Sequence, residues 1–297
     1  MATGISPDTF SEGAYLSVAE YKNAPTAVDI DNLVVGGNQA AQDAELANII
    51  LRASSYMDEY FNQNLLAGTT VETKRIRLTQ QGTLPIHPTN TPVVALLSLQ
   101  YGTDPNNLTT LPDPSLCWFE AQQIVVPLAQ LASPTYSSQG ALGFGFPVAA
   151  RTPLYCKYSY VAGYVNSIFA SATLAGATSL TVTDPSGIVP GQSLRIYDGA
   201  ASESVTVSSS YTFGNSTVTL ASPMVNAHSA GATIGNLPTA IKQACILLTS
   251  AFIKVRGDNS LTMAVTTRAN GNTSGANLFG NEVKLALDMV DKYRRIR

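Results

Sequence analysis

Residues 158–165 are YSYVAGYV and residues 237–256 are LPTAIKQACILLTSAFIKVR, and what separates these two stretches decides the fold. The residues leading into the first stretch alternate in polarity from Tyr155 onward, as in a half-buried strand. The second stretch has Pro238 at its start and apolar residues three and four positions apart, which predicts an amphipathic helix. Between them, residues 167–236 are rich in Ser, Thr, Ala, Gly and Val. We interpret them as a separate inserted module.

Within this inserted module, short segments alternate polar and apolar residues. The segments are TSLTVTD, SLRIYDG, ESVTVSS and STVTLAS, and turn residues such as Pro190-Gly191 and Asp198-Gly199 divide them. Such a pattern is typical of strands joined by tight turns. It predicts a compact antiparallel sheet or a small barrel.

The rest of the chain divides into helical and strand-rich parts. A long helix is expected from near Asp43 to Gln63, because its apolar residues recur at spacings of three and four. This apolar stripe consists of Leu46, Ile49, Ile50, Ala53, Met57, Tyr60 and Phe61. Residues 71–160 contain short β-rich runs, residues 261–280 resemble a long loop, and a last helix is expected with Asn281 as its cap.

These patterns predict an α+β fold with a helical-bundle core and a strand-rich region, interrupted by a small all-β insertion domain. The expected domains are residues 1–166 (first part of the core), 167–236 (the all-β module) and 237–297 (second part of the core, with a helix, a long arm and a C-terminal helix).

Composition excludes several classes of function. Only 12% of the residues are charged and the net charge is −3, so the chain lacks the excess of Lys and Arg that tight nucleic-acid binding needs. The two histidines, His87 and His228, are far apart in sequence, and no nucleophile-elbow, P-loop or zinc-protease motif occurs. We therefore expect no enzyme activity, no catalytic or metal-binding residues and no cofactor.

The expected cellular setting follows from the same survey. No stretch approaches the roughly 18 apolar residues that span a bilayer, and the N-terminus does not resemble a secretion signal, so no membrane partner is expected. The three cysteines, Cys117, Cys156 and Cys245, have neither a metal-binding spacing nor a disulfide framework, which favours a reducing compartment.

The C-terminal helix ends in four cations, Lys292, Arg294, Arg295 and Arg297. Cations at this end complement the helix dipole, so one interpretation is an ordinary solvated helix end. The alternative is a partner-binding site, in contact with an acidic partner or with passing DNA. We name these four residues as candidate partner-binding residues.

If the module is set aside, YSYVAGYV runs directly into LPTAIKQACILL. This junction resembles the head-to-tail connector, or adaptor, proteins of tailed bacteriophages, in which a strand ending in a Tyr-x-x-Gly-Tyr-like motif precedes a proline-initiated helix. Three further stretches resemble the same family in the same order, namely YLSVAEYKNA (residues 15–24), AELANIILRASSYMDEYF (44–61) and LPIHPTNTPVVALLSLQYG (84–102). The module resembles small β units of phage virion proteins, in which His228 would be a turn residue that determines the fold.

The resemblance implies a structural protein of the virion. It implies a ring-forming homo-oligomer, with twelve copies expected, that joins the portal protein to the tail or to a neck or stopper protein. Double-stranded DNA would pass through the lumen without sequence-specific binding. The ring would be located at the head–tail junction and assembled in the bacterial host cytoplasm, with residues 261–297 as the best candidate for portal docking. Whether residues near Lys74, Arg75 and Arg77 line the channel is left open by the sequence.

A second function remains open beside the adaptor. The module at residues 167–236 would be a carbohydrate- or host-surface-recognition unit of a virion surface or tail protein, with the rest of the chain only presenting it. Binding of the isolated module to a glycan array would favour this alternative over a structural role.

Overall fold

The computed structural model describes residues 13–26, 28–79, 83–120, 122–127, 153–255 and 278–295. The helices in these ranges are α1 (Val18–Asn23), α2 (Gln39–Phe61), α4 (Thr239–Val255) and α6 (Leu278–Val290), with short 3-10 helices η1 (Pro114–Leu116), η4 (Gly199–Ala201) and η5 (Asp291–Tyr293). The loop expected over residues 261–280 lies largely outside the described residues.

The strands form antiparallel sheets in two separate parts of the chain. In the first part they are β1 (Gly68–Arg77), β2 (Thr83–Ile86), β3 (Val93–Asp104), β4 (Asn107–Thr110), β5 (Trp118–Glu120), β6 (Gln123–Pro127) and β7 (Pro153–Ala162). In the second they are β8 (Asn166–Ile168), β9 (Ser179–Thr181), β10 (Ser193–Tyr197), β11 (Glu203–Thr206), β12 (Thr217–Thr219) and β13 (Thr233–Gly235). The four sheets have the orders β1-β7-β3-β4, β2-β6-β5, β11-β10-β13-β8 and β12-β9.

The predicted helical-bundle core is wrong. The secondary structure is 34% strand and 28% helix, and the described strands form four antiparallel sheets beside few helices. The physical reason is that the helices and the sheets bury their apolar faces in different places. Three separate hydrophobic clusters exist among the described residues, and the helices build only one of them.

The helical layer, which we define as α1, α2, α4 and α6, contains the first hydrophobic cluster. The predicted apolar stripe of α2 is buried there except for the partly buried Tyr60. Helix α2 begins earlier than expected, because the Asn38 side chain accepts a hydrogen bond from the Ala41 amide at 3.0 Å and so caps the helix ahead of Asp43. Helix α6 likewise begins at Leu278, before the expected cap Asn281.

The two-sheet body, which we define as β1 to β7, encloses the second cluster. Strand β7 is central in its sheet and pairs with β1 along its whole length, from Gly68 opposite Ala162 to Arg77 opposite Pro153. The side chains of β7 that are buried alternate with exposed or half-buried ones from Leu154 to Tyr160. This alternation places one face of the sheet on the core and the other on the outside.

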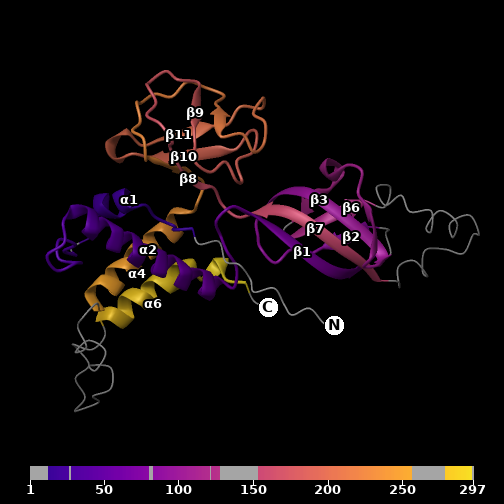
Figure 1. Ribbon diagram of the computed structural model, residues 1–297, viewed down its shortest axis with the longest axis horizontal. Helices are drawn as coiled ribbons and strands as arrows, with labels where there is room; N and C mark the ends of the chain where they lie inside the picture. Colours follow the sequence, from indigo (N-terminus) through magenta and orange to yellow (C-terminus); the bar gives the residue numbers. More distant parts are fainter. Residues whose placement is uncertain are drawn as a thin grey trace, which may run out of the picture.

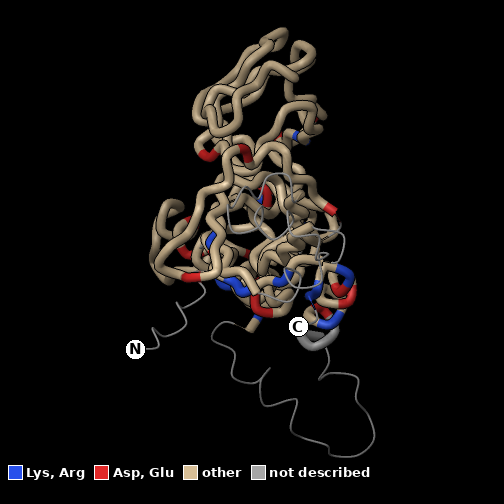
Figure 2. The backbone as a smooth tube through the Cα atoms, turned by 90° about the vertical axis from the view of Figure 1, so that its right-hand side faces the viewer, with Lys and Arg blue, Asp and Glu red and all other residues tan. Residues whose placement is uncertain are grey.

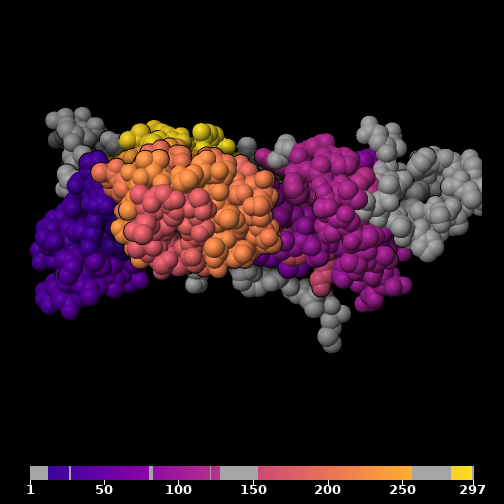
Figure 3. All heavy atoms as spheres, turned by 90° about the horizontal axis from the view of Figure 1, so that it is seen from above, coloured from indigo at the N-terminus to yellow at the C-terminus, as the bar shows by residue number. Residues whose placement is uncertain are grey.

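The inserted module contains the third cluster, formed by residues such as Phe169, Ile196, Val218 and Ile234. In Figure 1 the module lies above the helical layer, and the two-sheet body extends to the right of both. Seen from above, the module covers the middle of the molecule, between the N-terminal helices and the two-sheet body (Figure 3). The described residues therefore form three bodies, each with its own core, that meet at joints.

Charged residues are sparse over this surface. In Figure 2 the outer part of the module shows no charged positions, and its charges are near its base, toward the rest of the molecule. The described residues contain no helix long and apolar enough to cross a membrane.

Candidate functional site

An open cleft of about 540 Å³ lies where the inserted module meets α1 and α4. Its walls come from Leu16–Ala24 on one side, from Thr239–Ile246 of α4 on a second, and from residues 197–202 and 229–233 of the module on a third. The cleft is the place where three distant segments of the chain come together with buried polar groups. These groups make up the candidate site.

Lys242 is the central group of the cleft. It is only 6% exposed, and its ammonium group donates to Glu20 Oε1 at 2.5 Å and to Asn166 Oδ1 at 3.2 Å. The same nitrogen lies 4.4 Å from the centroid of the Tyr197 ring, on the module. Burial lowers the pKa of Lys242, while the Glu20 carboxylate acts in the opposite direction. The lysine thus connects α4 to α1 and to both β8 and β10 of the module.

Glu20 is fixed in place by the start of its own helix. Its Oε2 accepts from the Ser17 amide at 2.9 Å, and the Ser17 hydroxyl accepts from the Glu20 amide at 3.1 Å, which completes a capping box. Asn166 is held as well, because its amide nitrogen donates to the Ala14 carbonyl at 3.0 Å. Hydrogen bonds to other groups therefore orient the side chains of both Glu20 and Asn166 toward Lys242.

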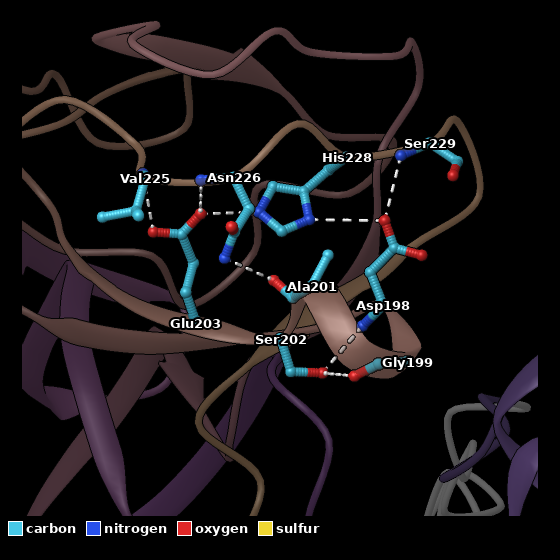
Figure 4. Close-up of polar contacts among 9 residues, drawn as sticks. All are labelled: Asp198, Gly199, Ala201, Ser202, Glu203, Val225, Asn226, His228 and Ser229. Atoms are coloured by element: carbon cyan, nitrogen blue, oxygen red, sulfur yellow. Dashed lines mark hydrogen bonds and ion pairs between the residues drawn. The ribbon is translucent and has the colours of Figure 1, made fainter.

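His228 lies in a second polar cluster, inside the module (Figure 4), of which Asp198, Ser202 and Ser229 line the cleft. Its side chain is fully buried; Nδ1 lies 3.3 Å from Asp198 Oδ2 and Nε2 lies 2.9 Å from Glu203 Oε1. Glu203 also accepts from the backbone amides of Val225 at 2.9 Å and Asn226 at 2.8 Å. The His228 ring therefore contacts Asp198 and Glu203, and Glu203 in turn binds the loop that precedes His228.

The electrostatics of this clamp favour the charged carboxylate. Burial raises the pKa of Glu203, but the two backbone amides and the His228 ring outweigh this effect and hold the pKa below its usual value. Asp198 accepts in turn from the Ser229 amide at 3.1 Å. Each ring nitrogen of His228 thus lies within hydrogen-bonding distance of a carboxylate oxygen.

The polar side chains of each of the two clusters bond to one another. Lys242 uses two of its three donors and a ring face, and both nitrogens of His228 have partners. The buried thiols of Cys156 and Cys245 have pKa values raised by burial to about 12, so they stay protonated at neutral pH. Among the described residues, no group of three or more His, Cys, Asp and Glu side chains could hold a metal ion.

The three candidate partner-binding residues that the structure describes do not form one patch. Arg295 turns inward, where its guanidinium donates to the Thr89 carbonyl and its backbone amide donates to the Phe61 carbonyl at 2.9 Å. Lys292 and Arg294 are exposed and lie over the rings of Tyr293 and Tyr60, at 4.9 and 5.2 Å.

Arg297 lies outside the described residues. Arg295 therefore holds the C-terminus against the two-sheet body, and a partner role for Lys292 and Arg294 stays a prediction.

Sequence reasoning missed the Glu20–Lys242 pair, although two signals for it exist. Ser17 and Glu20 have the spacing of a capping box, and Lys242 interrupts the apolar stripe of its helix between Ile241 and Cys245.

No protein-family model matches the chain, and no curated protein sequence matches it either.

Proposed function

We propose that this protein is a head-to-tail adaptor of a tailed-phage virion, a structural protein that forms a ring between the portal and the neck or tail. DNA passes through the lumen of this ring. The proposal places the protein at the head–tail junction, with assembly in the cytoplasm of the bacterial host. Its partners are further copies of itself, twelve in the resembling family, together with the portal and the next neck or tail protein.

The observation on which this proposal rests is the joint between β7 and α4. The two ends of the inserted module lie side by side there: the Val165 amide donates to Asn236 Oδ1 at 2.7 Å, and the Asn236 amide donates to the Val165 carbonyl at 3.0 Å. Asn166 and Gly235 pair in the adjacent strands. The chain therefore leaves β7 and returns toward α4 at two adjacent positions, Val165 and Asn236. This supports the resemblance, in which the strand runs directly into the helix once the module is set aside.

An exposed apolar groove on the helical layer supports self-association. It has a volume of about 590 Å³ between α2 and α4. Its apolar lining residues are Ile49, Leu51, Tyr56, Phe252 and Val255, and its remaining lining residues are Arg52, Ser55 and Glu59. Tyr56 is 40% exposed, and its ring meets that of Phe252 edge-on, with the centroids 6.2 Å apart.

We assign this groove to the contact with a neighbouring subunit. A ring requires such a head-to-tail contact between two different surfaces of the subunit. Aromatic side chains in a groove are typical of the well-packed centres of protein interfaces.

Ring formation with the portal protein of the same virus tests the proposal. We expect the purified chain, mixed with that portal, to form a complex that electron microscopy shows as a ring coaxial with the portal. The proposal is overturned if the folded chain neither joins the portal nor is found in the necks of intact particles. Because such adaptors can assemble only on their partner, a monomer in the absence of portal does not decide the question.

Substitutions in the groove connect the ring to the assigned contact. Tyr56→Glu places a charge in the groove and should abolish rings while leaving the circular dichroism spectrum unchanged. Leu174→Glu is the matched control, because Leu174 is 79% exposed on the inserted module, away from the groove. Rings that survive Tyr56→Glu would show that the subunit contact lies elsewhere.

A further inference from the structure

The outer face of the sheet formed by β1, β7 and β3 differs in charge from the rest of the protein. Along β1 the more exposed side chains are those at odd positions, including Thr73, Arg75 and Arg77. Along β7 the exposed position is Lys157, whereas its neighbours Cys156 and Tyr158 point into the core. Three cations, Arg75, Arg77 and Lys157, are therefore exposed on one face of the sheet.

The register of the strands brings these cations together. Thr73 and Gln100 are the direct neighbours of Lys157 on the two sides, and Arg75 stands opposite Tyr155 in the next row of the same face. Diagonal neighbours on one face are about 7 Å apart, and alternate residues along a strand are separated by about the same distance. The guanidinium of Arg75 lies 4.8 Å from the Tyr155 ring centroid, so stacking restricts its motion.

No described carboxylate forms an ion pair with any of these three cations. The nearest acidic side chain in sequence, Glu72, lies on the other face, where it accepts hydrogen bonds from Tyr158 at 2.8 Å and from Tyr160. Asp104 is at the end of β3, where its carboxylate accepts from the Asn106 amide at 2.9 Å. The three cations thus have no ion-pair partner among the described residues, and Asp104 adds one negative charge at the end of β3.

We propose that this outer face, centred on Arg75, Arg77 and Lys157, contacts the sugar–phosphate backbone of double-stranded DNA. Phosphates are bound by Arg and Lys together with the hydroxyl and amide donors of Thr, Ser and Gln, and such residues make up the rows around the cations. The face is a sheet several strands wide, so it meets the backbone without entering a groove and reads no bases. The inference rests on the proposed adaptor function for its setting, where it assigns the surface that faces the lumen.

The expected strength of this contact is low. Three phosphate contacts predict that log K falls with log salt with a slope of about −2.7, so affinity drops about 40-fold between 50 and 200 mM salt. A weak contact of this kind suits DNA that must move past the protein. It also agrees with a chain whose net charge is −3.

The test is fluorescence anisotropy of a labelled 30-base-pair duplex titrated with the full chain from 50 to 200 mM salt. We expect the triple variant Arg75→Gln, Arg77→Gln, Lys157→Gln to weaken binding at least tenfold at 50 mM salt and to flatten the salt slope. The matched control is Arg195→Gln, Lys254→Gln, Lys284→Gln, which removes the same charge from exposed positions of the inserted module and the helical layer. This control should bind as the unaltered chain does.

Two outcomes overturn the inference: no DNA binding by the unaltered chain at 50 mM salt, or equal binding by the triple variant. Loss of binding in the control instead of the triple variant would place the DNA contact on another surface and would also overturn the inference. These outcomes are separate from the adaptor proposal. Rings that join the portal without binding DNA refute only this inference, whereas DNA binding by a chain that never joins a portal refutes only the adaptor.

Discussion

Replacement of Lys242 by Met tests whether the Glu20–Lys242 pair holds the inserted module to the helical layer. Met keeps an apolar stem of similar length but has no ammonium group, so packing is preserved while the ion pair is lost. Glu20 then keeps only the hydrogen bond from the Ser17 amide, in a site where its side chain is 13% exposed. The substitution leaves a buried carboxylate without its cation.

The size of the effect follows from this burial. Removing one partner of a buried ion pair costs about 3–5 kcal/mol, because the remaining charge is uncompensated. We expect a cost near the lower end, about 3 kcal/mol, since the Ser17 amide still bonds to Glu20. With a urea dependence of about 3 kcal/mol per molar, the unfolding midpoint falls by about 1 M.

The assay is urea unfolding followed by two signals. Circular dichroism at 222 nm reports the helices, and fluorescence reports Trp118, the one tryptophan of the chain, on β5 of the two-sheet body. We expect the circular dichroism midpoint to move by more than the fluorescence midpoint, because the joint belongs to the helical layer and the module.

Two further variants make the result decisive. Lys254→Met breaks a more exposed pair with Glu282, whose side chains are 45% and 25% exposed, and should cost less than about 1 kcal/mol. Glu20→Gln combined with Lys242→Met removes both charges and should recover most of the lost stability. If Lys242→Met leaves the midpoint unchanged, or if the double variant is no more stable than the single one, the pair does not hold the joint.

Three other predictions concern single positions. Burial raises the pKa of Asp58 to about 7, so the contribution of this residue to stability is complete below about pH 4 and is lost as pH rises through 7. With Asp58→Asn, the free energy of unfolding measured in urea should therefore change less between pH 5 and 8 and should be higher than that of the unaltered chain at pH 8. A Cβ at Gly163 would lie 2.3 Å from the Leu66 carbonyl oxygen, so Gly163→Ala should lower the melting temperature well beyond Gly176→Ala, which shares a positive φ in open space. His228→Phe should cost about 2–4 kcal/mol and speed amide hydrogen exchange within residues 193–234, without affecting exchange in the two-sheet body.

The sequence predicted the long helices well because their signal is local. The apolar stripe of α2 depends only on residues three and four positions apart, and all of its members except Tyr60 are buried. The start of α2 was misplaced because Asn38 and Asp43 are both good capping residues, and local pattern does not choose between them. Asp43 instead forms an ion pair with Lys22, from another helix.

The fold class was wrong because it depends on which elements share a core, and this is not a local property. Strand β7 pairs with β1 and β3, far earlier in the chain, and these pairings give the two-sheet body a core of its own. The candidate site was missed for the same reason. Lys242 finds Glu20 and Asn166 at separations of 222 and 76 residues, whereas the sequence shows only that a lysine interrupts an apolar stripe.

The location of the buried charges gives these observations a common physical basis. Residues in a hydrophobic cluster are held by non-directional forces, so a joint between two clusters needs directional contacts to fix its geometry. The pair of Glu20 and Lys242 lies at the joint with the module, and Arg295 bonds to Thr89 at the joint with the two-sheet body. In a chain with only 12% charged residues, ionic groups at both joints specify how the three bodies sit relative to one another. In the proposed ring the same contact repeats many times and requires subunits of one shape, so weakening either joint should reduce ring formation before it unfolds any single core.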